Sequence, residues 1–467
     1  MEKYNQLNPE IIAQIQAVSD HVLVGDDINV DYARDEMPIY GTHMPDLVVQ
    51  PTSTEEVAAV MKICYENTIP VTPRGAGTGL AGGAVPLLGG VLMDTSKMNR
   101  ILNYDMENFV VEIESGVLLN DLANDCLSKG MMYPPDPGEK TASIGGNVIT
   151  NAGGMRAVRY GLTRDFVRCI EAVLPDGEIV QFSSNVVKNT TGYDIKDLVI
   201  GSEGTLCILT EVTLKLMPAP KFTRTLVMPF ENLESCIDMV PRLLQMAAVP
   251  TAIEFLEREL IDIVERNLHK LLPVKEGDAV LIVMYDAGSE QELLSACTEA
   301  SDAALEAGAI DVYIADTPER ITSVWSVRGA ILEGMKAESV AQEECDVVVP
   351  RAKIAEYVRL AKGIGAKYGI RVEPCGHAGD GNIHTEMLRG PEMSDEEWKA
   401  ATHASLTELY ALSKELGGQL SGEHGIGFAK KPYLMESLPE ENIRLMNGIK
   451  QVFDPKNILN PHKVAQI

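Results

Sequence analysis

The stretch VTPRGAGTGLAGGAV (71–85) decides the fold. Within it, Gly77, Gly79 and Gly82 have the G-x-G-x-x-G spacing of a dinucleotide-binding loop. A Rossmann site needs a strand, this glycine turn, and then a long helix whose N-terminus faces the pyrophosphate. The sequence after the turn therefore determines whether the spacing is meaningful.

The expected strand is present at 69–72, and Asp94 supplies an acidic residue at a plausible distance. The helix is missing, because LAGGAVPLLGG (80–90) holds four glycines and a proline. We therefore predict a loop of exposed backbone N–H groups, opening at Arg74, that curls around a phosphate. The alternative is a glycine-rich turn with no ligand.

Composition limits the classes of protein. The chain has 467 residues, enough for two or three domains, and a formal charge of −28. Such a charge argues against nucleic acid and against an anionic membrane surface as partners. The N-terminus lacks the plan of a signal peptide, and no apolar run is long enough to span a membrane, so we expect a cytoplasmic protein.

Eight cysteines are scattered along the chain without a C-x-x-C motif. This spacing gives no indication of an iron–sulfur cluster, a zinc ribbon or a redox dithiol, and it suits a reducing compartment. If the protein transfers electrons, they must pass to a partner that carries the next redox centre.

Alternating apolar patterns predict the elements. We expect a helix capped by Thr54, a hairpin with its turn at 175–177, and a single helix over 432–455. Helices between the later strands suggest an α+β sandwich, with helices on one face of a mostly antiparallel sheet. The expected strands are 47–49, 69–72, 91–94, 108–116, 222–230, 251–257, 279–287, 309–316 and 346–350, besides the two of the hairpin at 169–180.

Two further glycine clusters accompany the first. They lie in PPDPGEKTASIGGNVITNAGGMRAVRYG (134–161) and in GSEGTL (201–206). Three separated loops that expose backbone suit a long ligand, and a flavin dinucleotide has that length.

A second constellation lies in EPCGHAGDGNIHTEM (373–387). Asp380-Gly381 is a strong two-residue hairpin signal, which would place His377 directly opposite His384. Two imidazoles placed in this way can share a metal ion, and Glu386 would follow on the same face. The alternative is that each histidine is an ordinary core or surface residue.

The chain resembles the flavin-linked oxidases of the vanillyl-alcohol-oxidase type. The resemblance rests on PRGAGTGLAGG (73–83), SIGGNVITNAGG (143–154) and NTTGYDIKDLVIGSEGTL (189–206). GHAGDGNIH (376–384) and GEHGIG (422–427) narrow it to the FAD-linked D-2-hydroxyacid dehydrogenases, which include D-lactate dehydrogenase and the glycolate oxidase flavin subunit.

The resemblance implies an α+β fold with a two-lobed FAD-binding domain and an α+β cap domain with a mostly antiparallel sheet. We expect the FAD domain at 1–220, the substrate-binding cap at 221–415, and a C-terminal segment at 416–467 that returns to the FAD domain. The glycine loop has no histidine for covalent attachment, so FAD is expected to bind non-covalently. The expected FAD contacts are Arg74, Gly75, Ala76, Gly77, Thr78, Gly79, Pro135, Asp136, Ser143, Gly145, Gly146, Asn151, Gly153, Gly154, Gly201, Glu203 and Gly204.

The resemblance also assigns roles in the second constellation. It gives His377, His384 and Glu423 to one divalent metal (Zn, Fe or Mn), with Glu386 as the fallback ligand, and it gives His424 to catalysis. Arg328, in a W-x-x-R pattern, would grip the substrate carboxylate. Related enzymes often add basic residues after it, where this chain has Glu343 and Glu344.

The implied reaction is oxidation of a small D-2-hydroxy acid, D-lactate first, with glycolate and D-2-hydroxyglutarate as competitors. The chain looks most like the lactate dehydrogenase subunits of anaerobic bacteria, which implies electron-transferring flavoprotein as the redox partner. Electron bifurcation would then link NAD and ferredoxin. Iron–sulfur subunits and quinones are the other acceptors the family offers. Two other classes stay open: a metal-dependent hydrolase, and a non-catalytic flavin-binding subunit.

Overall fold

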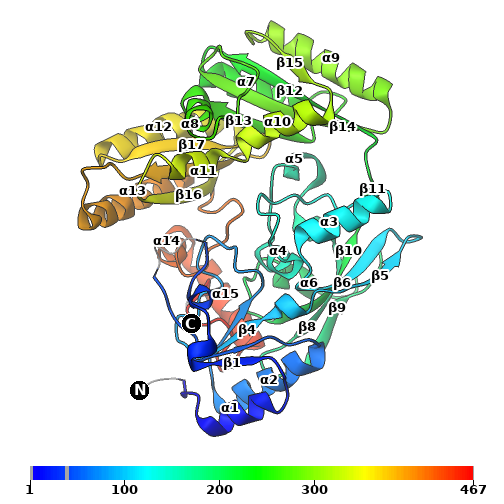
Figure 1. Ribbon diagram of the computed structural model, residues 1–467, viewed down its shortest axis with the longest axis vertical. Helices are drawn as coiled ribbons and strands as arrows, with labels where there is room; N and C mark the ends of the chain where they lie inside the picture. Colours follow the sequence, from blue (N-terminus) through cyan, green and yellow to red (C-terminus); the bar gives the residue numbers. More distant parts are fainter. Residues whose placement is uncertain (1–3, 37–40, 466–467) are drawn as a thin grey trace. The chain divides into compact units, whose positions relative to one another are not determined.

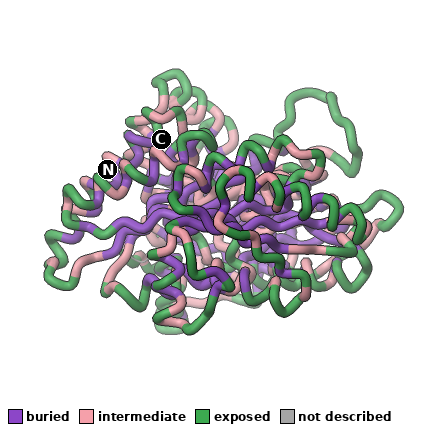
Figure 2. The backbone as a smooth tube through the Cα atoms, turned by 90° about the horizontal axis from the view of Figure 1, so that it is seen from above, coloured by how far each residue is buried: buried purple, intermediate pink, exposed green. Residues whose placement is uncertain are grey.

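The computed structural model describes residues 4–36 and 41–465, and the chain divides into two compact units. Unit 1 comprises 1–152, 162–219 and 423–467, and unit 2 comprises 153–161 and 220–422. Buried segments, drawn in purple, run through the inside of the tube, and many exposed ones, in green, form its outer turns (Figure 2). Among the described residues, no helix is both long and apolar enough to cross a membrane.

The first sheet of unit 1 carries the glycine loop. Strands β2, β4 and β3 are parallel and β1 pairs with β2 in the antiparallel sense, giving the order β1-β2-β4-β3 (Figure 1). Strands β2 and β4 are buried throughout, as parallel strands covered on both faces must be. The bounds are β1 Val22–Val24, β2 Leu47–Val49, β3 Val71–Arg74 and β4 Val91–Asp94.

Helix α2 (Thr54–Asn67) connects β2 to β3. The expected cap is one residue off, because Ser53 is the N-cap and its Oγ accepts a hydrogen bond from the Glu56 N–H at 3.3 Å. The Thr54 hydroxyl instead donates to Glu171 Oε1 at 2.8 Å. An extended backbone at Ser53 explains the difference, since an N-cap residue lies outside the helical region.

The second sheet of unit 1 is antiparallel, with the order β5-β6-β10-β8-β9. It confirms the predicted hairpin: Leu174 N donates to Glu178 O at 2.9 Å, and Gly177 takes φ +90° in the turn. The strands are β5 Ile101–Asp105, β6 Val110–Glu114, β8 Val167–Val173, β9 Ile179–Ser183 and β10 Ile208–Lys215; β7 Met131–Met132 and β11 Met217–Pro218 form a separate pair.

The tail forms two helices where one was expected. Helix α14 (Lys431–Ser437) ends before Pro439, and α15 (Glu440–Phe453) begins after it. The residue before a proline is driven out of the helical region, and Leu438 is extended with ψ 147°. The other unit 1 helices are α1 Pro9–Gln16, α3 Leu119–Ser128, α4 Ile144–Thr150, α6 Ile195–Val199, and the 3₁₀ turns η1 Gly25–Asp27, η2 Val30–Ala33, η4 Thr95–Lys97 and η5 Thr163–Phe166.

Unit 2 is built on an antiparallel seven-stranded sheet with the order β15-β12-β14-β13-β17-β18-β16 (Figure 1). The strands are β12 Phe222–Phe230, β13 Ala252–Glu257, β14 Ala279–Ala287, β15 Tyr313–Ala315, β16 Gln342–Val348, β17 Arg371–His377 and β18 Asn382–Leu388. The helices are α5 Ala157–Tyr160, α7 Leu233–Leu244, α8 Arg258–Leu268, α9 Glu290–Glu306, α10 Pro318–Arg328, α11 Ile331–Lys336, α12 Ile354–Lys367 and α13 Asp395–Glu415, with the 3₁₀ turn η6 Arg351–Lys353.

Helices cover both faces of this sheet, so the expectation of helices on one face is wrong. On one face, Cys375 packs with residues of α8, α10 and α11 in a single core cluster. On the other face, a Cβ at Gly365 of α12 would overlap Val372. The sequence carries the reason: AVLIVMY (279–285) in β14 is a continuous apolar run, buried throughout, where a one-sided strand would alternate.

Candidate active site and cofactor loops

The glycine loops of unit 1 meet one another. A Cβ at Gly75 would overlap Ser143 Oγ, so the first loop touches the start of α4. A Cβ at Gly204 would lie 2.6 Å from Pro73 Cγ in β3, where Gly204 has φ +69°. The three loops predicted from sequence therefore gather around the end of β3 and the helix α4.

The loop after β3 is not a Rossmann turn. Residues 75–90, all of them described, contain no helix. This confirms the sequence argument that glycines and Pro86 prevent helix formation there. Asp94 serves the local structure instead: its Oδ2 accepts hydrogen bonds from Tyr32 OH and Gln50 Nε2 at 3.0 and 2.8 Å.

The Arg74 side chain holds the start of the glycine loop in place through hydrogen bonds. Its guanidinium donates to the carbonyl oxygens of Arg34 and Asp31 at 2.8 and 3.0 Å, and lies 5.7 Å from the centre of the Tyr32 ring. A Cβ at Gly77 would overlap this guanidinium, and Gly77 has φ +74°. Gly77, the first glycine of the G-x-G-x-x-G motif, therefore has to be glycine, because the Arg74 guanidinium occupies the place of a Cβ.

The loops suit a long polar ligand. Buried polar atoms without a hydrogen-bond partner among the described residues include Ser115 Oγ, Asn147 Nδ2 and Ser202 Oγ, all in or beside these loops. A Cβ at Gly79 would meet nothing within 4 Å, so open space lies against that backbone. Buried polar groups are normally satisfied, so their presence here fits a bound cofactor.

The other expected FAD contacts are distributed as follows. Ser143, Gly145, Gly146 and Asn151 lie at the two ends of α4, while Ala76, Thr78, Pro135, Asp136 and Gly201 lie in loops of unit 1, and Gly153 and Gly154 belong to unit 2. A Cβ at Gly145 would lie 2.6 Å from Ser115 Cβ. This crowding explains why the second cluster requires glycine.

The hairpin of unit 2 has a different register from the expected one. His377 pairs with Asn382, and His384 pairs with Cys375, so residues 378–381 form a longer turn. Gly381 is the last residue of this four-residue turn. It has φ +92°, and a Cβ there would overlap Val349 O. The prediction of directly opposed histidines is wrong, but both side chains still point to the same face because their pairing positions differ by two residues.

The two histidines contact each other through one nitrogen each. His377 Nε2 lies 3.4 Å from His384 Nε2, and the rings are nearly perpendicular at 88°. Two nitrogens bound to one tetrahedral metal at 2.0–2.1 Å would lie about 3.3 Å apart. The spacing therefore suits a shared cation.

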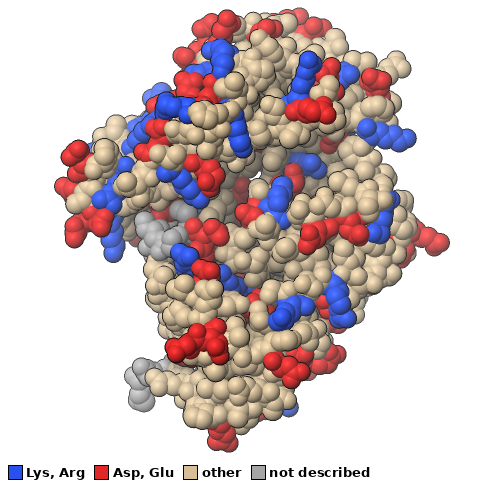
Figure 3. Space-filling view, in the orientation of Figure 1, with Lys and Arg blue, Asp and Glu red and all other residues tan. Residues whose placement is uncertain are grey.

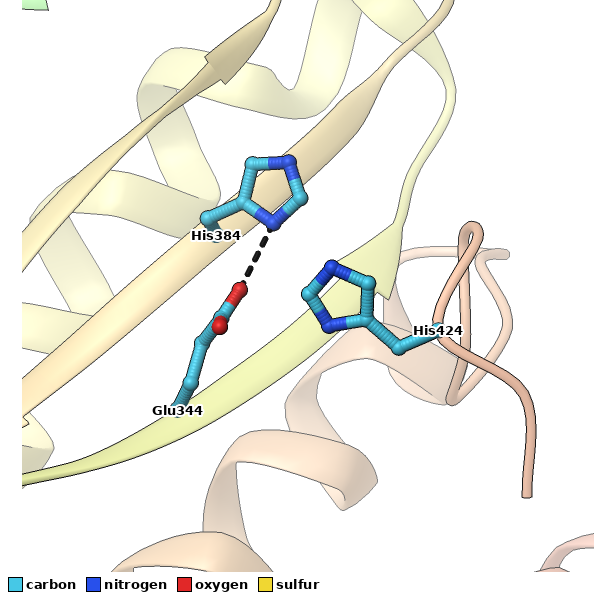
Figure 4. A group of neighbouring side chains, drawn as sticks. All are labelled: Glu344, His384 and His424. Atoms are coloured by element: carbon cyan, nitrogen blue, oxygen red, sulfur yellow. Dashed lines mark hydrogen bonds and ion pairs between the residues drawn. The ribbon is translucent and has the colours of Figure 1, made fainter. Parts of the chain in front are cut away.

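Each histidine is oriented by a carboxylate at its other nitrogen. His377 Nδ1 lies 2.6 Å from Glu254 Oε1. His384 Nδ1 lies 2.7 Å from Glu344 Oε1, the contact drawn as a dashed line in Figure 4. A neutral imidazole that donates from Nδ1 presents a lone pair at Nε2, which is the arrangement that supports metal-bound histidines.

Glu254 connects His377 to Arg328. Its Oε2 accepts a hydrogen bond from Arg328 Nε at 2.8 Å, and the carboxylate is fully buried. Burial alone would raise the pKa of Glu254, but His377 and Arg328 hold that pKa below its usual value. Sequence reasoning missed Glu254; the one available signal was an acidic residue within the apolar strand TAIEFLE (251–257).

Acidic residues form a row beside His384. Glu344 pairs with Glu386, and Glu386 with Glu373, on three neighbouring strands. Burial raises the pKa of Glu386 well above the usual range, and Glu344 adds to the effect. Glu386, the fallback ligand, thus lies among register-paired glutamates beside His384.

Glu423 and His424 begin the last segment of unit 1, directly after Gly422 of unit 2. Gly422 N donates to Asp346 Oδ2 at 3.0 Å, and Asp346 is the register partner of His384. Consecutive Cα atoms are about 3.8 Å apart, so the chain leaves unit 2 beside this strand. His424 is the other histidine drawn in Figure 4.

Comparison with known proteins identifies the family. The model described as "FAD binding domain" matches residues 45–183, and "FAD linked oxidases, C-terminal domain" matches 219–464. The chain belongs to the FAD-linked oxidases. This FAD-linked oxidase is an oxidoreductase, and FAD is its cofactor.

Relatives cover nearly all of this FAD-linked oxidase. It is 51% identical to D-lactate dehydrogenase of Anaerostipes hadrus, over 99% of this chain and 98% of that protein. It is 40% identical to D-lactate dehydrogenase of Archaeoglobus fulgidus, over 90% and 91% of the two chains. It is 36% identical to the glycolate oxidase subunit GlcD of Bacillus subtilis, over 93% and 91%.

Solved structures confirm the fold. The structure of 4-ethylphenol oxidase from Gulosibacter chungangensis matches with a TM-score of 0.80 at 19% identity, covering 99% of this chain and 98% of that one. The structure of p-cresol methylhydroxylase matches with a TM-score of 0.79 at 20% identity, covering 97% and 96%. The two-lobed FAD-binding fold of the vanillyl-alcohol-oxidase type, expected from the sequence, is confirmed.

Proposed function

We propose that this FAD-linked oxidase oxidises D-lactate to pyruvate and passes the electrons to a partner protein. The observation that supports this most strongly is the 51% identity to a D-lactate dehydrogenase along almost the whole chain. The second candidate is a glycolate or D-2-hydroxyglutarate dehydrogenase flavin subunit, and the GlcD relative at 36% identity supports it.

The glycine loops of unit 1 hold the cofactor in this proposal, without a covalent bond. Bound FAD supplies the acceptor for the hydride from the substrate Cα. The proposed contacts in unit 1 are Arg74 to Gly79, Pro135, Asp136, Ser143, Gly145, Gly146, Asn151, Gly201, Glu203 and Gly204, and Gly153 and Gly154 follow in the chain. Close backbone approach at Gly75 and open space at Gly79 support this assignment.

His377, His384 and Glu423 are proposed to hold one divalent cation, of Zn, Fe or Mn type. The 3.4 Å spacing of the two Nε2 atoms and the carboxylates behind both rings support this. A cation at this position would supply Lewis-acid chemistry and positive charge. Both suit an anionic substrate on a protein with formal charge −28.

His424 is proposed as the general base that takes the proton from the substrate hydroxyl. Arg328 is proposed to bind the substrate carboxylate, with its orientation fixed by the hydrogen bond from Nε to Glu254. The hydroxyl proton would pass to His424 and the Cα hydride, which carries two electrons, to the flavin, and pyruvate would remain.

Electrons must leave through another protein in this proposal, and we assign electron-transferring flavoprotein to that role in a cytoplasmic complex linked to NAD and ferredoxin. All eight cysteines are buried, and among the described residues no cysteine belongs to a close group of three possible metal ligands. Basic side chains are interspersed with acidic ones on the face seen in Figure 3, so no broad basic area distinguishes that face.

Substrate comparison tests the proposal. Initial rates with an artificial electron acceptor are measured for D-lactate, L-lactate, glycolate and D-2-hydroxyglutarate. A kcat/KM highest for D-lactate supports it, and a higher value for glycolate or D-2-hydroxyglutarate favours the second candidate. Flavin that none of the four reduces would point to the non-catalytic subunit.

A further inference from the structure

The chain crosses from unit 2 to unit 1 at Gly422 and Glu423. The residues proposed as metal ligand and base, Glu423 and His424, thus lie at the crossing itself. Their immediate neighbours on both sides, Ser421 to Gly422 and Gly425 to Gly427, are bound by buried carboxylates. One carboxylate lies in each unit.

Asp346 holds the unit 2 side. Its Oδ2 accepts hydrogen bonds from Ser421 Oγ and Gly422 N at 2.9 and 3.0 Å, and its Oδ1 accepts from Asn382 Nδ2 at 2.7 Å. Asp346 is completely buried. A Cβ at Gly422 would overlap the Asn382 amide, so the chain packs tightly against this anchor.

Glu203 holds the unit 1 side. Its Oε1 accepts from Ile426 N and its Oε2 from Gly427 N, both at 2.7 Å. A Cβ at Gly425, where φ is +83°, would lie 2.9 Å from Glu203 Cδ. The side chain that sequence reasoning gave to the cofactor is therefore turned to the backbone after His424.

The anchor in unit 1 is itself firmly placed. Glu203 N donates to Ile149 O at 2.8 Å, and its carbonyl oxygen accepts from Asn460 Nδ2 at 2.8 Å. Its φ of +53° is a left-handed conformation that a non-glycine residue adopts only where the surroundings hold it. Charge-assisted hydrogen bonds to neighbouring N–H groups are short and strong, so the loop has little freedom.

We propose that Asp346 and Glu203 are the positioning residues of the Glu423–His424 pair, each fixing the backbone on one side of it. This inference rests on the proposed function in taking His424 as the base and Glu423 as a ligand. Neither carboxylate acts on the substrate; each holds the main chain so that the pair is presented in one conformation. Catalytic groups displaced by about 1 Å commonly lose much of their rate.

The test uses the full-length holoenzyme with E203Q and D346N. Two matched controls also lose a buried, hydrogen-bonded carboxylate. E114Q removes a carboxylate in unit 1 that accepts from Arg100 N at 2.7 Å. D286N removes one in unit 2 that accepts from Thr223 Oγ1 at 2.6 Å. Per mole of bound FAD, kcat for D-lactate is expected to fall at least about tenfold in E203Q and D346N, with KM changed less than about threefold. The controls should stay within about twofold of wild type.

Two readouts separate positioning from general stability. Amide hydrogen exchange over residues 421–427 should speed up in E203Q and D346N and not in the controls, and E203D should recover part of the kcat lost in E203Q. Unchanged kcat, or a loss no greater than in the controls, would overturn the inference. If wild type fails to oxidise D-lactate, the proposed function fails, and hydrogen exchange alone decides whether the two carboxylates hold this segment.

Discussion

His377 Nε2 and His384 Nε2 lie 3.4 Å apart, and the Nδ1 atom of each ring contacts its own glutamate. The sheet register produces this geometry by pairing His377 with Asn382 and His384 with Cys375. A ring that donates from Nδ1 to its glutamate presents the lone pair of Nε2 toward the other ring. This geometry supports the proposed metal site.

Removal of the cation should abolish turnover while FAD stays bound. Dialysis against a chelator is expected to leave the visible flavin spectrum intact and to lower kcat by about 10²-fold or more, with recovery on adding Zn²⁺, Mn²⁺ or Fe²⁺. H377A and H384A should purify with little bound metal, as measured by elemental analysis. His403, on α13, offers the control H403A, which should retain it. Full activity in metal-free enzyme would contradict the metal role.

Substitution of Arg328 should weaken substrate binding and leave the structure of α10 unchanged. R328K keeps the charge but loses the planar fork, so KM for D-lactate is expected to rise about 10- to 100-fold. The matched control is R320M on the same helix, where Arg320 pairs with Asp316 at 2.9 Å on the exposed side. Steady-state kinetics that show equal KM for R328K and wild type would remove Arg328 from the substrate site.

Glu254 should make stability depend on pH in acid. Its pKa in the folded state lies below the usual carboxyl value, so its contribution is complete above about pH 4.5 and is lost as pH falls through the folded pKa. In E254Q that titration is absent. Denaturant unfolding of the metal-free protein between about pH 6 and pH 3 should show the difference between wild type and E254Q shrinking as the pH falls. A constant difference would rule out this linkage.

Alanine substitutions at two glycines of the loop should have different effects. G75A should fold with a stability lower by about 1 kcal/mol, because Ser143 Oγ would have to turn away from the new Cβ and give up its cap on the Gly146 N–H. G79A should fold with unchanged thermal stability as the apoprotein, since nothing lies within 4 Å, yet bind FAD about tenfold or more weakly if the cofactor occupies that space. Titration with FAD measures this, and G390A, in a loop of unit 2 where a Cβ also has open space, serves as the control. Equal FAD affinity of G79A and wild type would move the cofactor elsewhere.

The sequence predicted the outcome of the glycine loop correctly because the evidence was local. Four glycines and a proline after the loop exclude a helix whatever the tertiary structure. The hairpin at 175–177 was also readable, since its turn residues act within four positions. The helix boundary at Ser53 was missed by one residue, because Ser53 and Thr54 are both capable caps and only the backbone conformation chooses between them.

The hairpin register and the carboxylate partners could not be read from the sequence. A two-residue turn at Asp380 and Gly381 is the common solution, but the structure uses a longer one, which the packing of Gly381 against Val349 favours. Glu254 reaches His377 across 123 residues and Glu203 reaches Gly427 across 224. Such pairings depend on the sheet order, which no local pattern contains.

An anaerobic visible spectrum of the purified protein, before and after adding D-lactate and separately L-lactate, tests the proposed reaction most directly. We expect a flavin spectrum that bleaches with D-lactate and not with L-lactate, and we expect H424A to bind FAD without bleaching. Flavin that D-lactate leaves oxidised would contradict the proposed reaction.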